Sequence, residues 1–165
     1  MHSEIAIAVA APAELVFALA HDVERWATLL PHYARSSAVR RTPDGRLVAD
    51  FVARRPIVGL LGLGLPVAWR SVAWNEPDRW RLRFHHIGGV TRGMDVVWRI
   101  EPADDGCRVT IEHDFRPRVP GLASVVDRWF TRAIAGRTLA TFKALAEAIA
   151  PLEAPGANRP ADPTP

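Results

Sequence analysis

The chain has 165 residues, of which 48% are hydrophobic and 24% charged, and its formal net charge is +3. This composition is typical of one globular domain, and a single cysteine, Cys107, excludes an internal disulfide and a metal site built from several cysteines. No stretch approaches the roughly 18 apolar residues of a membrane span, and no signal peptide opens the chain, so we expect a cytoplasmic protein. Its basic residues are scattered, which argues against nucleic acid as a partner.

The N-terminal segment predicts a strand followed by two helices. Residues Ile5–Val9 form a short apolar run that is typical of a strand. Pro12 stands at a helix start, where its fixed φ is tolerated, and apolar residues from Leu15 to Ala20 recur at helical spacing. Asp22 is the expected N-cap of a second, short helix that contains Trp26.

Further segments predict an antiparallel sheet with one apolar face and one solvated face. Apolar and polar residues alternate with a period of two most clearly in the last three of these segments. Turn residues such as Pro43–Gly45 and Asp104–Gly106 separate neighbouring segments. The expected strands are Arg35–Arg41, Arg46–Arg54, Val67–Asn75, Arg79–His86, Met94–Glu101 and Cys107–Arg116.

A long helix is predicted from about Leu122 to Ile149, and it would cover the concave apolar face of the sheet. Gly136 interrupts this helix and has two interpretations, a close-packing site or a kink or gap that leaves room above a ligand. We expect a ligand-binding domain over residues 1–150 and a disordered, proline-rich tail over residues 151–165. The expected apolar positions of the helix include Val126, Trp129, Ala133, Ala140 and Leu145.

Four stretches carry a resemblance to a known family: AAPAELVFALAHDVERW, LLPHY, MDVVW and HDFRP. On these the chain resembles the helix-grip (START-like) superfamily and, within it, the polyketide cyclase/dehydrase proteins that include the bacterial aromatase/cyclases. The resemblance implies an α+β fold in which a curved antiparallel seven-stranded sheet wraps around a long C-terminal helix. Two short helices would follow the first strand, and the fold would enclose an internal hydrophobic cavity.

The resemblance also implies a function. In the polyketide branch the cavity binds a poly-β-ketone chain and directs an intramolecular aldol condensation followed by dehydration to an aromatic ring. This chain would then be a cyclase or dehydratase acting on a polyketide-like substrate, without a cofactor or a metal ion. Ubiquinone-binding relatives of the same superfamily imply an alternative, a non-catalytic carrier of a lipid or quinone.

The expected catalytic residues are Tyr33, His113 and Asn75. Tyr33 offers a hydroxyl group, and His113 titrates near neutral pH. For Tyr33 and the inward histidines, the alternative is a buried side chain with an ordinary hydrogen-bond partner. The resemblance and the inward strand positions together predict the ligand-binding residues: Trp26, Phe51, Trp69, Ser71, Trp80, Phe84, His86, Met94, Trp98 and Trp129.

Asn75 aligns with an arginine to which the family assigns a catalytic part. Asn75 can donate hydrogen bonds but carries no charge with which to stabilise an enolate. Arg70 follows the inward Trp69, so strand alternation turns its side chain outward. A bulge in this strand would let Arg70 turn inward and take the place of the missing arginine.

The connection Pro56–Pro66, PIVGLLGLGLP, is apolar where a loop is normally polar. Three interpretations stay open. The segment could fold over the cavity mouth as a lid, or contact a second copy of the chain or an acyl carrier protein. It could also dip into a membrane surface, as a peripheral contact, to collect a lipophilic ligand.

Overall fold

The computed structural model describes residues 1–56, 64–117, 126 and 131–153. Each of the seven predicted strands is present in it, with bounds that shift by a few residues. Asp22 caps the first helical turn after α1 by accepting a hydrogen bond from the backbone N–H of Glu24 at 3.2 Å. The elements are β1 (His2–Val9), α1 (Ala13–Ala20), η1 (Val23–Arg25), α2 (Trp26–Leu29), β2 (Tyr33–Arg41), β3 (Leu47–Pro56), β4 (Gly64–Glu76), η2 (Pro77–Arg79), β5 (Arg81–Gly89), β6 (Met94–Ala103), β7 (Gly106–Phe115) and α4 (Arg132–Glu153).

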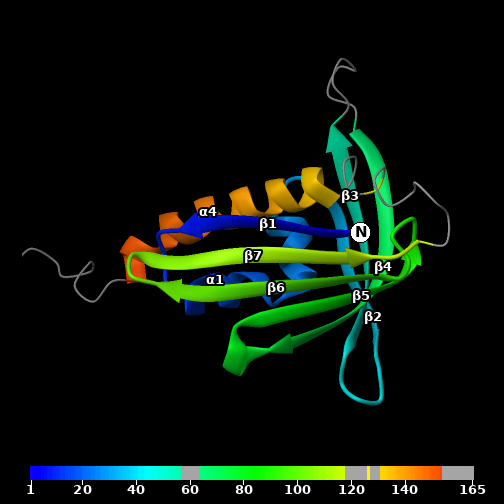
Figure 1. Cartoon of the computed structure of the whole chain (residues 1–165), viewed down its shortest axis with the longest axis horizontal. Coiled ribbons are helices and arrows are strands. Elements are labelled where there is room, and N and C mark those ends of the chain that lie inside the picture. The colour runs from blue at the N-terminus through cyan, green and yellow to red at the C-terminus, as the bar shows by residue number, and fades with distance from the viewer. Residues whose placement is uncertain (57–63, 118–125, 127–130, 154–165) are drawn as a thin grey trace, which may run out of the picture.

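All seven strands belong to one antiparallel sheet in the order β1-β7-β6-β5-β4-β3-β2. The first two strands of the chain therefore lie at opposite edges of the sheet, and α1, η1 and α2 connect these edges. In Figure 1, β6 and β7 run alongside α4, whereas β3 and β4 run steeply across that direction. The sheet thus curves around the C-terminal helix, which is the fold that the sequence predicts.

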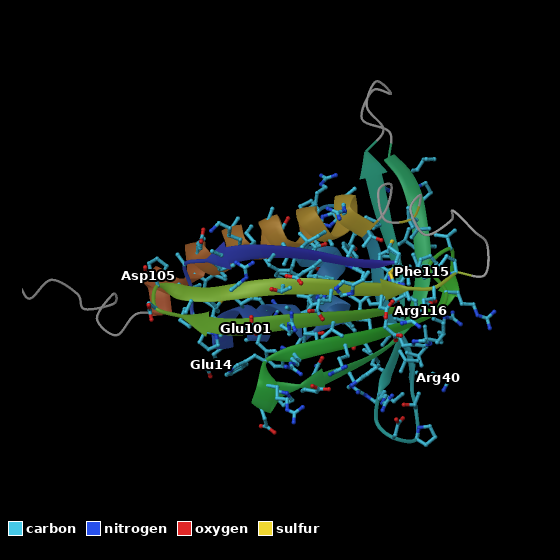
Figure 2. The ribbon with its side chains drawn as sticks, viewed as in Figure 1. Glu14, Arg40, Glu101, Asp105, Phe115 and Arg116 are labelled. Carbon is cyan, nitrogen blue, oxygen red and sulfur yellow. The ribbon has the colours of Figure 1, made fainter. Side chains whose placement is uncertain are left out.

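Strand alternation places the core on the concave side of the sheet. Every second residue from Met94 to Ile100 on β6 is buried, and so is every second residue from Cys107 to Phe115 on β7. Figure 2 shows Phe115 at the opposite end of β7 from Asp105, which marks the turn after β6. The outer face is polar and carries ion pairs between neighbouring strands, such as the one from Arg99 to Glu112.

The buried stripe of α4 differs from the predicted one. Ala140 was expected to be an apolar contact, but it is exposed. The apolar side chains that α4 buries lie on a different face of the helix from Ala140. They are Ala135, Leu139, Phe142 and Ala146. Alanine is abundant on every face of this helix, so the apolar pattern alone did not identify the face that packs on the sheet.

Trp80 lies outside the strand that the sequence assigned to it. It follows η2 with φ of 50°, in the left-handed region, and β5 begins only at Arg81. Its ring packs edge-on against Phe17 of α1, with 5.3 Å between the centroids. The inward row of β5 therefore begins with Leu82 rather than with Trp80.

Two other predicted segments lie partly outside the described residues. β3 and β4 stay paired as far as Pro56 and Gly64, so the apolar connection narrows to residues 57–63, which are not among those described. Helix α4 continues to Glu153, past the expected start of the tail at residue 151. Residues 154–165 are likewise not described, and neither is Trp129 of the predicted helix.

Within the described part of the chain, no residue packs closely against Gly136. A Cβ atom added at this position would meet no heavy atom within 4 Å among the described residues. Packing therefore does not require glycine, although glycine in a helix interior costs about 1 kcal/mol relative to alanine. Of the two interpretations of this residue, the structure removes the close-packing one.

The chain's single lysine fastens α4 to the first strand. Lys143 Nζ donates to the carbonyl of Ala8 at 2.8 Å and to Glu147 Oε1 at 2.5 Å. Glu147 Oε1 also accepts the backbone N–H of Ala10 at 2.7 Å. The hydrogen bond from Ala10 and the one from Lys143 lower the pKa of Glu147 below its usual 4.5.

We expect the substitution Glu147→Gln to lower the melting temperature at neutral pH, because the amide keeps an acceptor but loses the charge. A carboxylate whose pKa is lower in the folded state stabilises the fold above its unfolded-state pKa and loses this contribution as the pH falls. The difference in melting temperature between wild type and Glu147→Gln should therefore shrink below pH 4.5. Thermal unfolding at several pH values measures it, and a difference independent of pH would contradict the assignment.

Candidate functional site

A cluster of aromatic rings fills the space between the sheet and α4. Trp26 stands at its centre, where its indole N–H donates to the carbonyl of Ala20 at 2.9 Å. The centroid of its ring lies 5.5 Å from that of Trp98 and 5.6 Å from that of Phe84, both on the sheet. It lies 6.0 Å from the ring centroid of Phe142 on α4. The other rings of the cluster are those of Tyr33, Phe51 and Trp69.

The cluster leaves a cavity of about 80 Å³ between the sheet and the helix. Nine of the thirteen residues predicted for the site line this cavity. They come from α2, from α2's neighbour β2 and from strands β3 to β7, so the curvature of the sheet brings them together. These lining residues are Trp26, Tyr33, Phe51, Trp69, Phe84, His86, Met94, Trp98 and His113.

Three predicted site residues that the structure describes do not line the cavity, and a fourth cannot be placed. Asn75 is exposed at the end of β4, where it lines a different, polar cleft and its Nδ2 lies 3.5 Å from the carbonyl of His21. Ser71 is fully buried in the sheet, opposite His86 in the register. Trp80 packs on α1, and Trp129 lies outside the described residues.

Arg70 does not replace the missing arginine. A register shift does occur beside it, but the extra residue is Ile87 on β5, because Arg70 pairs with Gly88 and the next residue of β4 pairs with His86. The Arg70 guanidinium points outward and holds both carboxylate oxygens of Asp50, at 2.6 and 2.8 Å. Among the residues that the structure describes, no arginine lines the cavity.

His86 is a buried, uncharged histidine. Its Nδ1 lies 2.7 Å from Thr91 Oγ1, and its ring stacks on that of Trp69 at 6.0 Å. Burial, helped by the nearby His113, lowers the pKa of His86 to about 3. The imidazole is therefore neutral at pH 7, and it is a weak base.

Tyr33 is also buried and uncharged. Burial raises the pKa of its phenol, and a hydrogen bond with the Thr138 side chain opposes that effect. Thr138, on α4, is 1% exposed and lines the same cavity. Its Oγ1 also lies 2.9 Å from Nε2 of His32, a buried residue in the turn before β2.

Sequence reasoning missed the threonines of the site and His32. Thr131 and Thr138 stand seven residues apart, two turns of helix, and both line the cavity from the α4 side. A polar pair at this spacing on the buried stripe of an otherwise alanine-rich helix was the available signal. Thr91 had none, because it lies in the turn after β5 and reaches the cavity only through the fold.

In residues 1–56, 64–117, 126 and 131–153, no three His, Cys, Asp or Glu side chains come together as they would around a metal ion. Over the same residues, no helix combines the length and the apolar character needed to cross a membrane.

The sequence is similar to that of a known protein family. A family model described as polyketide cyclase / dehydrase and lipid transport matches residues 1–147. A protein of Streptomyces cyaneus described as a "Putative polyketide cyclase" is 28% identical over 134 residues, which are 77% of this chain and 84% of that protein.

Solved structures agree on the fold. The Zhui aromatase/cyclase from Streptomyces sp. R1128 superposes with a TM-score of 0.74 at 21% identity, covering 94% of this chain and 98% of that one. A START superfamily protein from Mycobacterium smegmatis superposes with a TM-score of 0.65 at 15% identity, covering 90% and 98%.

The buried histidines predict acid sensitivity. Since burial lowers the pKa of His86 from 6.5 to about 3, the unfolded chain binds a proton that the folded chain does not bind below pH 6.5. The free energy of unfolding should therefore fall as the solution is acidified, by about 1 kcal/mol for this histidine from about pH 7.5 to about pH 5.5.

The substitution His86→Gln should remove that part of the loss, as measured by urea unfolding at the two pH values. The matched control is His85→Gln, because His85 lies next in sequence but on the outer face, where it bonds Asp95 at 2.7 Å. The control should keep the part of the loss that the burial of His86 causes, because burial is the largest cause of its lowered pKa. Equal acid sensitivity in His86→Gln and wild type would contradict the prediction.

Proposed function

The chain belongs to the polyketide cyclase/dehydrase and lipid transport family, and we propose that it binds a hydrophobic poly-ketone or aromatic compound in the cavity and promotes its aldol cyclisation and dehydration. The observation that carries this proposal is the presence of three titratable side chains in one largely apolar, aromatic cavity. Tyr33, His86 and His113 come from β2, β5 and β7 and all line it. A carrier of a purely apolar ligand has no need of such groups.

The reaction needs few groups. A base takes a proton from a carbon between two carbonyls, and the resulting enolate carbon forms a bond to a second carbonyl carbon of the same chain. The oxygen of that carbonyl gains a proton and becomes a hydroxyl. The new carbon–carbon bond closes the ring, and loss of this hydroxyl with a neighbouring hydrogen, as water, then forms a double bond in it. The catalyst supplies one proton-transfer group, a hydrogen bond to oxygen, and a folded substrate.

We assign the base to His113 rather than to His86. Nδ1 of His86 is engaged with Thr91, and a pKa near 3 makes this imidazole a poor proton acceptor. His113 lies on the same concave face, with only β6 between its strand and that of His86. In this proposal His86 and Tyr33 orient the oxygens of the ligand.

The size of the cavity limits what it holds. Ligand pockets for drug-sized molecules measure about 300–1,000 Å³, whereas this cavity measures about 80 Å³. We therefore propose that the cavity takes the reacting end of an elongated ligand rather than the whole molecule. The aromatic rings around it suit a flat, unsaturated chain end.

His113→Asn should reduce kcat/KM for a β-ketone model substrate by about a hundredfold, because it removes the base. Tyr33→Phe should reduce it by about tenfold through loss of one hydrogen bond. The melting temperatures of both variants should stay close to that of wild type, and His85→Asn on the outer face is the matched control. Losses of turnover that follow losses of stability would return both residues to a structural role.

The compound that co-purifies with the protein separates the enzyme from the carrier. Extraction of the purified protein and mass spectrometry should recover a poly-ketone or an aromatic product of its cyclisation. A bound quinone or lipid, together with no turnover of β-ketone substrates, would overturn the cyclase proposal and support the carrier.

A further inference from the structure

The cavity ends at a common level on the elements around it. On β6 its lining stops at Trp98, and the next inward residue, Ile100, is buried but does not line the cavity. On β7 the lining stops at Ile111, which pairs with Trp98 in the register. On α4 it stops at Thr138, and Phe142, about one turn further along, lies outside it. A boundary therefore crosses the described part of the interior at this level.

Three aromatic side chains form this boundary, and we call them the ring wall: Trp26, Trp98 and Phe142. Their ring centroids are 5.5 Å apart for the two indoles, and Phe142 lies 6.0 Å from Trp26 and 5.8 Å from Trp98. The two indoles line the cavity, whereas Phe142 stands behind them and is 2% exposed. Its ring is steeply inclined to both indoles, by 66° and 80°, and so supports them from behind.

His113 lies one step along the sheet from the ring wall. It follows Ile111 by two residues on β7, and it pairs with Val96, which is two residues from Trp98 on β6. Two residues of an antiparallel strand span about 7 Å. A ligand that places a carbon at His113 therefore has only a short space, of about this length, for the group that lies between that carbon and the wall.

We propose that the ring wall is a depth stop that selects ligands by the length of their leading group, the part that lies between His113 and the wall. Trp98 is the specificity-determining residue of the stop, because its ring lines the cavity directly, whereas Trp26 also holds the carbonyl of Ala20. A longer leading group displaces the ligand toward the part of the cavity that Thr91 and Thr131 line. This inference rests on the proposed function, because the same cavity is the ligand site.

Linear 2,4-diketones of increasing length test the depth stop by calorimetric titration at pH 7. The series from hexane-2,4-dione to decane-2,4-dione keeps one acetyl end and lengthens only the alkyl end. In wild type the affinity should rise by about fourfold for each added methylene until the alkyl end reaches the wall, and should then stop rising. A rise that continues through decane-2,4-dione, or no binding of any of these diketones, would overturn the proposal.

Matched variants test whether Trp98 sets the limit. Trp98→Leu moves the wall back, so the affinity should keep rising for about one or two carbons more than in wild type. Phe17→Leu is the control, because Phe17 is a buried ring of α1 that neither lines the cavity nor belongs to the ring wall. This control should keep the wild-type limit. The same limit in Trp98→Leu and in wild type would overturn the proposal.

A measurement on the wild-type protein covers the case in which Trp98→Leu does not fold. Proton NMR of the complex with octane-2,4-dione should show nuclear Overhauser effects from the alkyl methyl group to the indole protons of Trp26 or Trp98, and from the acetyl methyl group to Thr91. The opposite orientation, or contacts from the alkyl methyl group to Phe142, would overturn the proposal. None of these measurements reads turnover, so failure of the cyclase proposal and failure of this one are distinguishable.

Discussion

The position of one indole ring governs the interior of this protein. Trp26 is fixed by its N–H bond to the carbonyl of Ala20, and a buried N–H without such a partner would cost about 1–3 kcal/mol. From that position the ring touches Phe51 and Trp98 on the sheet and Phe142 on α4. The ring therefore sets how closely the sheet and the helix approach each other, and the cavity is the space that this contact leaves. The polar side chains of the site line that space.

The interior is polar without being charged. Burial keeps His32 and His86 neutral and Tyr33 protonated at pH 7. The charged partners Arg70 and Asp50 face outward instead, where solvent screens them. A ligand in the cavity would thus meet directional hydrogen bonds and aromatic faces rather than an ionic contact.

The strands could be read from the sequence because their signal is local. From Met94 to Ile100 every second residue is buried, as the alternation predicts, although the outward residue Val97 is apolar. The errors occur where tertiary contacts decide the outcome. The prediction for Ala140 was wrong because alanine occurs on every face of its helix, so the pattern did not identify the buried face. The prediction for Trp80 was wrong because this residue adopts a left-handed backbone conformation before β5 begins. The register shift beside Arg70 falls on the neighbouring strand, and His32 reaches the site from a turn. The periodicity of one strand predicts neither the register shift on its neighbour nor the contact made by His32.

The presence of a lysine rather than an arginine at position 143 also follows from geometry. The chain has 21 lysines and arginines, and the only lysine is Lys143. Its ammonium group serves the carbonyl of Ala8 and the carboxylate of Glu147, two acceptors on different elements. A compact tetrahedral ammonium can point separate N–H bonds at such partners, whereas the planar guanidinium of arginine requires acceptors close to one plane. Lys143 therefore stands at a junction between β1 and α4 where the shape of the cation matters as well as its charge.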